Sequence, residues 1–358
     1  MSMSKVASTG PLRKSSRGIR VSGLAIAASA GLLLSGCAQS TATPSTDSAD
    51  NDAAGACDFS PSYPNGPIEM AVPWAAGGGT DSVSRFVGSQ LADRLGTQVN
   101  VVNRDGGGGV IGHTAIANAK PDGSTIGMAT VEITMMHWQG LTDLSYKDIT
   151  PISQVNSDPS GITVAADAPW QTIEELLEAA RSNPGEIVGS GTAIGGIWDL
   201  ARAGMLIEAG MDPNAIRWVP SAGAAPALQE LAAGGIDVSF SSLAENDTMI
   251  QAGEVRPLAI MGEKRDPKYP DVPTLKESGV DFSMGTWRGI AGPAGMDEDV
   301  VAELNCYLDD IVHSDAYADF METSRFGVDW RDTNDFTEFV AGEDSAKGEI
   351  MQAAGLAG

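Results

Sequence analysis

Three consecutive glycines follow a short apolar run in the stretch AVPWAAGGGTDSVSRF, which begins at Ala71. The order of residues predicts a strand, a flexible turn over Gly77–Gly79, and a helix capped by Thr80 or Asp81. Such a turn presents unpaired backbone N–H groups and the positive end of a helix dipole. Glycine also allows a ligand to touch the backbone. The turn therefore predicts a site for a small anion.

A nucleoside triphosphate is disfavoured as that anion, because a Walker-type phosphate loop carries Lys and then Ser or Thr after its last glycine. Here Thr80 and Asp81 follow Gly79. A carboxylate needs fewer donors and no lysine. A tight turn without a ligand is the alternative for a single loop of this kind.

Three further segments repeat the order of strand, turn rich in Gly, Ser or Thr, and helix. They are residues 103–112 (NRDGGGGVIG), 189–196 (GSGTAIGG) and 219–223 (VPSAG). In open α/β sheets, ligands bind in the crevice at the carboxyl ends of the strands. The recurrence predicts that the four loops converge on one ligand-binding cleft.

The second of these loops also matches the dinucleotide-binding pattern GxGxxG, with Gly107, Gly109 and Gly112 as its glycines. The glycines do not directly follow the predicted strand, and the basic and apolar N-terminal residues predict export. A dinucleotide site is therefore the less favoured alternative.

Signatures of an enzyme are sparse. The histidines are His113, His137 and His313, and no HExxH, metal-ligand spacing or GxSxG motif occurs. Ser190 lacks the upstream glycine of a nucleophile elbow. We therefore expect no catalytic residue, no metal site and no cofactor.

Tryptophans lie near the predicted loops. Trp74, Trp198 and Trp287 are candidate walls of the ligand site, with a packing role in the core as the alternative for each.

The first 37 residues predict export and lipidation. A basic head and the apolar run VSGLAIAASAGLLL precede Leu34-Ser35-Gly36-Cys37, which resembles a bacterial lipobox. A plain signal peptide followed by a chance cysteine is the alternative. We expect residues 1–36 to be removed and Cys37 to carry the lipid. Residues 37–57 have few bulky apolar side chains and are expected to form a flexible tether.

The chain is strongly acidic, with 47 Asp and Glu against 22 Lys and Arg and a net charge of −25. The charged side chains among residues 1–36 are all basic, so removal of this segment makes the net charge of the chain more negative still. Nucleic acid and anionic lipid surfaces are poor partners for such a protein. An anion site must then work by local geometry, against long-range repulsion.

Two cysteines, Cys57 and Cys306, remain after lipidation of Cys37. In an exported protein they favour a disulfide, and two separate thiols are the alternative.

Strand-like and helix-like segments alternate along most of the chain, which predicts an α/β fold. Expected strands are residues 68–72, 99–103, 124–130, 186–190, 236–241 and 255–261. Expected helices are residues 82–95, 173–181, 197–209, 224–233 and 297–314, with a last helix from about 334. Thr172 and Glu175 are expected to form a capping box at the start of helix 173–181.

Together these loops resemble motifs of the solute receptors of tripartite tricarboxylate transporters, the Bug family. The family motif VPFxAGGxxD is similar to residues 72–81, and NRPGAGGxIG is similar to residues 103–112. AxPDGxT matches residues 119–125, DVPTxxExG matches 271–279, and WxGxxxPAG matches 287–295. The motifs occur in order over nearly the whole chain after the tether.

The resemblance implies a type II periplasmic-binding-protein fold, in which two α/β domains close on a small anion. Domain 1 would comprise residues 58–157 and 286–358, and domain 2 residues 158–285. The implied function is capture of a small organic carboxylate, a di- or tricarboxylate or an aromatic acid, and its delivery to a large and a small membrane subunit. A ligand-sensing receptor and an exported enzyme are the alternatives. The protein is expected to be a monomer on the outer face of the cytoplasmic membrane or in the periplasm.

Family members commonly hold the carboxylate through backbone N–H groups of the first loop. By position, ligand contacts carry over to these residues: Trp74, Ala75, Ala76, Gly77, Gly78, Gly79, Thr80, Asp81, Thr130, Ser190, Gly191, Thr192, Ala193, Ser221, Ala222 and Gly223. A side chain added at Gly78 is expected to obstruct the ligand, whereas loss of the Arg104 side chain is expected to matter less.

The sequence departs from the family pattern at several positions. Trp74 replaces the usual Phe, Asp105 the usual Pro, and Ser221-Ala222-Gly223 the pattern YxG. Residues 194–198 (IGGIW) replace a segment that is often polar. The additional Trp198 predicts a ligand with an apolar or aromatic body.

Overall fold

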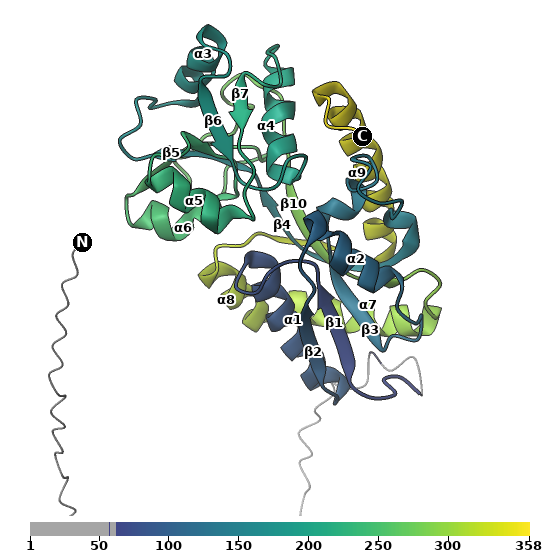
Figure 1. The fold of residues 1–358 in the computed structure, drawn as a ribbon. Helices are drawn as coiled ribbons and strands as arrows, with labels where there is room; N and C mark the ends of the chain where they lie inside the picture. The colour runs from purple at the N-terminus through teal and green to yellow at the C-terminus, as the bar shows by residue number, and fades with distance from the viewer. Residues whose placement is uncertain (1–56, 58–61) are drawn as a thin grey trace, which may run out of the picture. The chain divides into compact units, whose positions relative to one another are not determined.

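A computed structural model describes Cys57 and residues 62–358. The predicted α/β fold is confirmed: two β-sheets of mixed strand direction are each covered by helices (Figure 1). The predicted signal peptide, the lipobox residue Cys37 and all of the predicted tether except Cys57 lie outside the described residues. No helix within the described part of the chain is long and apolar enough to cross a membrane.

One sheet has six strands in the order β11-β4-β10-β3-β1-β2. Its strands are β1 (Ile68–Val72), β2 (Val99–Asn103), β3 (Thr125–Thr130), β4 (Ile149–Pro159), β10 (Gly285–Pro293) and β11 (Val328–Arg331). β1 pairs in parallel with β2 and β3, whereas β10 is antiparallel to both β3 and β4. The carboxyl ends of β1 and β3 therefore lie at one edge, where the first glycine loop begins.

Helices from both ends of the described chain pack around this sheet. They are α1 (Gly79–Leu95), α2 (Val110–Ala117), α7 (Glu298–Val312), α8 (Asp315–Thr323) and α9 (Thr333–Ala354). Apolar side chains of α1 and α7 meet those of β1 and β3 in a buried core, among them Met70, Val87, Leu91, Ile126 and Leu304. This core fixes the start of α1 against the sheet.

The other sheet has five strands in the order β7-β6-β8-β5-β9. Its strands are β5 (Gly161–Ala165), β6 (Ile187–Ser190), β7 (Ile216–Trp218), β8 (Val238–Ser239) and β9 (Val255–Ile260). β6 is parallel to β7 and β8, and β5 is antiparallel to β8 and β9. The neighbouring helices are α3 (Ile173–Ser182), α4 (Ile197–Glu208), α5 (Ala224–Ala232) and α6 (Leu243–Gln251).

The chain passes from one sheet to the other twice. It leaves the six-stranded sheet where β4 ends at Pro159, and β5 begins at Gly161. It returns at Gly285, the first residue of β10, which pairs with β4 over most of its length. In Figure 1, β4 and β10 run side by side toward the five-stranded sheet.

Most predicted elements occur within a few residues of their expected bounds, with two corrections. The expected strand 236–241 pairs only over Val238–Ser239, because the chain then turns into α6 at its N-cap, Ser242. The expected capping box is half formed. Thr172 accepts the N–H of Glu175, but the Glu175 carboxylate accepts the N–H of Gln171 instead of that of Thr172.

A disulfide joins Cys57 to Cys306 on α7, with Cα atoms 5.5 Å apart. It closes a sequence separation of 249 residues and ties the start of the described chain to a C-terminal helix.

We expect both cysteines to resist alkylation in the native protein until a reductant is added, which intact-mass measurement detects. Cys306→Ser should lower the free energy of unfolding by about 2–5 kcal/mol, because the unfolded chain gains the freedom of a long loop. Two thiols that react freely without reductant would contradict the bridge.

Candidate functional site

A cavity of about 130 Å³ lies where loops of the two sheets face each other. The six-stranded sheet and its loops contribute Trp74, Ala75, Gly79, Thr80, Thr130, Glu132, Thr286 and Arg288. The loops of the five-stranded sheet contribute Thr192, Ile197, Trp198, Ala222, Gly223, Ala224 and Glu245. Both sheets thus supply walls, and a ligand in the cavity would contact both.

Three helices direct their N-termini into this cavity, and each begins after a glycine. Gly78, Gly196 and Gly223 are the N-caps of α1, α4 and α5, and none supplies a side-chain cap. By contrast, α3, α6, α7, α8 and α9 begin at a Thr, Ser or Asp whose side chain accepts a backbone N–H. α2 also begins at a glycine but does not line the cavity. Uncapped first-turn N–H groups are therefore concentrated around the cavity, and they favour an anion.

The first loop is held in shape by Asp81. Its carboxylate accepts the N–H of Gly77 (2.9 Å) and the amide of Asn103 (2.9 Å), and pairs with Arg85 (2.8 Å). Burial opposes ionisation, but the hydrogen bonds from Arg85, Gly77 and Asn103 outweigh it and lower the pKa of Asp81. Asp81 does not line the cavity. Asp81 is therefore a positioning residue: its hydrogen bonds fix the backbone of residues 77–80.

The loop before α4 repeats this arrangement. Gly195 donates its N–H to Asp199 (2.9 Å), and Asp199 pairs with Arg202 (2.6 Å). In both loops the glycine that donates its N–H lies four residues before the buried aspartate. The same local device therefore orients a helix N-terminus toward the cavity from each sheet.

Thr192 lies in the third loop and lines the cavity. Its carbonyl accepts the N–H of Ser221 (2.9 Å) and the indole N–H of Trp218 (3.3 Å), which connects the third and fourth loops. Its hydroxyl is buried and has no hydrogen-bond partner among the described residues. A buried polar atom without a partner is costly, so this hydroxyl is a candidate ligand contact.

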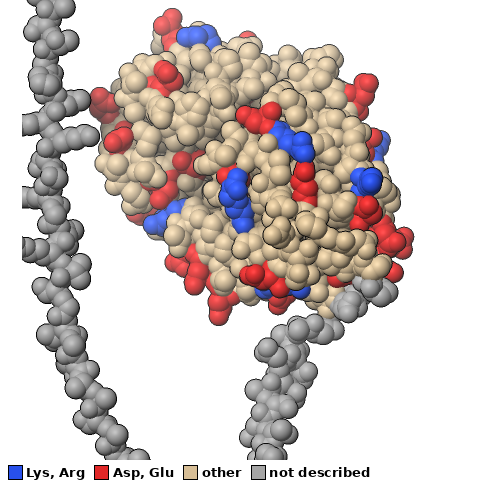
Figure 2. Space-filling view, turned by 60° about the horizontal axis from the view of Figure 1, so that its bottom comes forward, with Lys and Arg blue, Asp and Glu red and all other residues tan. Residues whose placement is uncertain are grey.

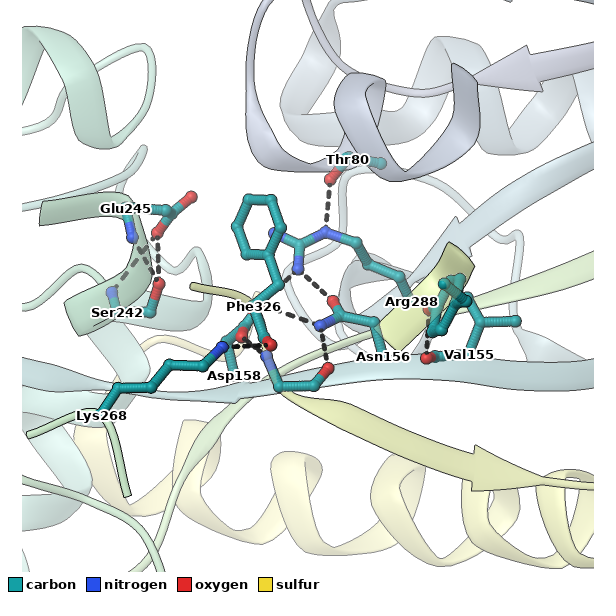
Figure 3. A network of polar contacts seen from close by, with 11 residues as sticks. Thr80, Val155, Asn156, Asp158, Ser242, Glu245, Lys268, Arg288 and Phe326 are labelled. Atoms are coloured by element: carbon teal, nitrogen blue, oxygen red, sulfur yellow. Dashed lines mark hydrogen bonds and ion pairs between the residues drawn. The ribbon is translucent and has the colours of Figure 1, made fainter. Parts of the chain in front are cut away.

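Arg288 on β10 brings a positive charge to the cavity (Figure 3). Its Nε donates to the Thr80 hydroxyl (3.0 Å), and its Nη1 donates to Asn156 and to Asp158 (2.6 Å). The guanidinium lies over the Phe326 ring, 5.4 Å from its centre. Nη2 has no hydrogen-bond partner among the described residues and faces Gly79, since a Cβ at Gly79 would lie 2.9 Å from it. This nitrogen is free to meet a ligand oxygen.

Phe326 is held in place by Lys268, which comes from the far side of the cleft. The Lys268 ammonium donates to the carbonyl of Met321 (3.0 Å), which lies within α8, and to that of Phe326 (2.9 Å), which lies beyond its end (Figure 3). Burial lowers the pKa of Lys268. The contact fastens the loop after β9 to the segment that carries the aromatic ring beneath Arg288.

A chain of hydrogen bonds leads from Trp74 to Glu132, which lies in a short 3-10 helix (Val131–Thr134) after β3. The Trp74 indole donates to the Thr130 hydroxyl (3.2 Å), and that hydroxyl donates to Glu132 (2.6 Å). His113 accepts the backbone N–H of Thr130 (3.1 Å). Burial lowers the pKa of His113 to about 4, so the imidazole is neutral near pH 7 and packs behind the cavity wall.

The structure separates the predicted site residues into two groups. Those that line the cavity are Trp74, Ala75, Gly79, Thr80, Thr130, Thr192, Ala222 and Gly223. Those that lie behind or beside it are Ala76, Gly77, Gly78, Asp81, Ser190, Gly191, Ala193 and Ser221. Several of the second group support the wall: Ser190 donates to the carbonyl of Val219 (2.7 Å), and Ser221 to that of Gly223 (2.9 Å).

Two expectations about the site require correction. Trp287 is not a wall of this cavity, because it is buried with its ring edge-on to Phe336 at 5.3 Å. The second glycine loop does not reach the cavity either. It supports the first loop instead: Asn103 donates to the carbonyl of Trp74 (2.9 Å), and a Cβ at Gly112 would lie 2.3 Å from the Cα of Pro73.

Sequence reasoning missed Glu132, Glu245 and Arg288. Arg288 lies within the motif at residues 287–295, so its position offered a signal. Glu132 and Glu245 follow no recognisable motif, and α6, which carries Glu245, was not predicted. Arg104, whose side chain was expected to matter less for binding, pairs with Glu69 at 2.5 Å and does not line the cavity.

Comparison with known proteins gives a consistent result. Residues 83–356 match the family described as "Tripartite tricarboxylate transporter family receptor". A Pseudomonas protein encoded in the tcbD–tcbE intergenic region is 32% identical over 250 residues, which cover 69% of this chain and 74% of that protein. Protein BugT of Bordetella pertussis is 30% identical over 259 residues, which cover 71% of this chain and 78% of BugT.

Solved structures agree over most of the described residues. A TctC solute binding protein from Polaromonas has a TM-score of 0.68 and 33% identity, covering 81% of this chain and 99% of that one. An R. palustris protein solved with adipate has a TM-score of 0.74 and 26% identity, covering 82% and 99%. MatC from Rhodopseudomonas palustris, solved with bound malate, has a TM-score of 0.72 and 26% identity, covering 80% and 99%.

Proposed function

The chain belongs to the family of tripartite tricarboxylate transporter receptors, the periplasmic solute-binding proteins that include BugT. We propose that it captures a small organic carboxylate and delivers it to the membrane subunits of such a transporter. It has the two-domain α/β fold of these receptors, the type II fold that the sequence predicted. Adipate and malate, bound to two structural relatives, are both small carboxylates. They support this class of ligand.

One observation carries the proposal: three glycine-capped helix N-termini and the free Nη2 of Arg288 surround a single cavity between the two sheets. A carboxylate there would accept hydrogen bonds from first-turn N–H groups and from Arg288. Hydrogen bonds to a charged group contribute about 1.5–3 kcal/mol each, so three of them contribute about 4.5–9 kcal/mol, which corresponds to affinities from about millimolar to micromolar. The Thr80 and Thr192 hydroxyls are further donors at the same cavity.

The remaining wall is apolar. Trp74, Ile197 and Trp198 also line the cavity and give it apolar surface. We propose that they pack against the carbon body of the ligand, whether this is an alkyl chain of a di- or tricarboxylate or an aromatic ring.

We also propose that residues 158–285 move as one domain against residues 58–157 and 286–358. The chain crosses between the sheets at the adjoining ends of β4 and β10, so these two strands would carry the hinge. Arg288 and Asp158 lie at this crossing, which couples the proposed hinge to the cavity. The receptor would act as a monomer.

A thermal-shift screen tests the ligand class. Monocarboxylates, dicarboxylates, tricarboxylates and aromatic acids are each added to the purified receptor. A ligand at one hundred times its Kd stabilises the native state by about 2.7 kcal/mol, enough for a clear rise in Tm. At least one carboxylate should raise Tm, and mass spectrometry should recover it unchanged. If none does so, or if the ligand is converted, the receptor proposal is wrong.

Anchoring is a separate proposal, and Leu34-Ser35-Gly36-Cys37, which lies outside the described residues, supports it. Cys37→Ala should move the protein from the membrane fraction to the soluble fraction. Mass spectrometry should find lipid on Cys37 of the wild type only. A variant that stays in the membrane fraction, with no lipid on the wild type, would refute the lipobox.

A further inference from the structure

The cavity contains two acidic side chains that capture of a simple anion does not explain. Glu132 comes from the 3-10 helix after β3, and Glu245 comes from the first turn of α6. Both line the same cavity as the helix N-termini and Arg288, one from each side of the cleft.

Each carboxyl group has one oxygen held by its own surroundings. Glu132 Oε2 accepts the Thr130 hydroxyl (2.6 Å), and Glu245 Oε2 accepts the hydroxyl (3.2 Å) and the backbone N–H (3.3 Å) of Ser242. The other oxygen of each has no hydrogen-bond partner among the described residues. In Figure 3 the second oxygen of Glu245 points away from Ser242. Glu132 as a residue is 5% exposed, and it lines the cavity, so a ligand there would lie beside its carboxyl group.

The positive charge of Arg288 does not balance both groups, because it is already paired with Asp158. The two side chains lie 2.6 Å apart and are 3% and 4% exposed. The first-turn N–H groups carry only partial charge. Burial raises the pKa of both Glu132 and Glu245, and the charge of Arg288 opposes this rise at both groups without cancelling it.

We infer that the ligand carries a positively charged nitrogen in addition to its carboxylate, and that Glu132 and Glu245 receive this nitrogen. The ligand class is then a small zwitterion, an amino acid or a betaine. The inference rests on the proposed function, since it assigns the carboxylate to the helix N-termini and Arg288. Trp74 and Trp198 offer aromatic surface at the same cavity, and aromatic faces attract cations.

The charge of the whole protein agrees with this ligand class. The chain has a net charge of −25, and acidic side chains are spread over the face drawn in Figure 2. Such a surface repels a di- or tricarboxylate at long range, whereas it does not repel a ligand without net charge.

A second ligand chemistry fits the same two side chains: protonated glutamic acids could donate to a second carboxylate of a dicarboxylic acid. The two readings differ in what the nitrogen contributes. Removal of the ammonium group weakens binding under our inference and does not weaken it under the alternative.

Calorimetric titration of matched probes tests the inference on the wild-type protein. The zwitterions are glycine, 4-aminobutanoate, 5-aminopentanoate and glycine betaine. Their partners without the charged nitrogen are acetate, butanoate and pentanoate, and succinate, malate and adipate serve as dicarboxylates. At least one zwitterion should bind about 10–100-fold more tightly than its partner, the ratio expected from one charge-assisted hydrogen bond.

Two variants then assign the effect to the glutamates. Glu132→Gln and Glu245→Gln keep an acceptor for Thr130 and for Ser242, and Gln also completes a capping box. Each variant should weaken binding of the zwitterion by about tenfold or more, while the affinity for the partner without the charged nitrogen changes little. Glu230→Gln, at an exposed position on α5 away from the cavity, is the control and should leave all affinities unchanged.

The outcomes separate the inference from the proposed function. If dicarboxylates bind, zwitterions do not, and both Gln variants keep full affinity, the inference is wrong and the carboxylate receptor stands. If zwitterions bind no better than their partners, the inference is again wrong, even where a variant fails to fold. If no carboxylate of either kind binds, the proposed function fails as well.

Discussion

Replacing Arg288 with methionine is expected to abolish carboxylate binding and to lower the free energy of unfolding by about 3–5 kcal/mol. The guanidinium joins β10 to β4 through Asn156 and Asp158 and reaches Thr80 at the start of α1. Its loss leaves the buried Asp158 carboxylate without a counter-charge. Chemical denaturation measures the stability, and titration with the best ligand from the screen measures the binding.

A double variant separates these two effects. Asp158→Asn added to Arg288→Met removes the uncompensated charge but retains an acceptor for the N–H of Gly327, which Asp158 holds at 2.8 Å. Stability should recover in large part, whereas binding should remain lost. Normal affinity in a folded Arg288→Met protein would show that Arg288 does not contact the ligand.

Gly79→Ala is expected to weaken ligand binding by about ten- to a thousandfold with little effect on the fold, because one or two hydrogen bonds to a charged oxygen are lost. A Cβ at Gly79 would lie 2.9 Å from Arg288 Nη2 and 3.0 Å from Phe326 Cζ. The guanidinium must then shift from the position in which it faces the cavity. Calorimetry on the folded variant measures the change.

Gly78→Ala is the matched control, and it revises an expectation from the sequence. Gly78 has φ −86°, which any residue adopts, and an added Cβ would have only the Ala75 carbonyl oxygen nearby, at 3.8 Å. Gly78 therefore tolerates a methyl group, and the sensitive glycine is its neighbour. Equal affinities for the two variants would contradict the geometry assigned to the first loop.

Much of the fold was predictable because local patterns and tertiary packing agree there. The strand before α1 and the amphipathic α7 each follow from a periodic pattern or a cap. The predicted cap of α1, Thr80 or Asp81, is wrong, because the helix begins at Gly79 and its N-cap is Gly78, which has no side chain to cap it. β4 and β10 were not predicted as strands. β10 is rich in glycine (Gly285, Gly289 and Gly292), and its pairing with β3 and β4 outweighs its weak strand propensity.

The site was predictable only where a turn rich in Gly, Ser or Thr connects a predicted strand to a predicted helix. Gly79 and Thr80 begin α1 at the end of the loop that follows β1, and Thr192 lies in the loop that follows β6. Arg288 reaches α1 from 208 residues farther along the chain, as its bond to Thr80 shows. The two residues meet only because the chain returns to the six-stranded sheet at β10. No local sequence pattern could therefore reveal that an arginine contacts the uncharged turn.

The second glycine loop illustrates the opposite error. Its glycines looked like ligand contacts, but Gly112 is required because the backbone of Pro73 passes too close for a side chain. A glycine-rich turn can serve close packing between two loops as well as close approach of a ligand, and the sequence does not distinguish the two.

The central claim is that the cavity recognises a carboxylate, and one calorimetric comparison tests it most directly. The best-binding ligand from the screen is titrated beside its carboxamide, which has nearly the same shape and lacks the negative charge. The account predicts that the carboxamide binds about a hundredfold more weakly or worse, because hydrogen bonds from helix N-termini and Arg288 to a charged oxygen are lost. Equal affinity for the two compounds would contradict it.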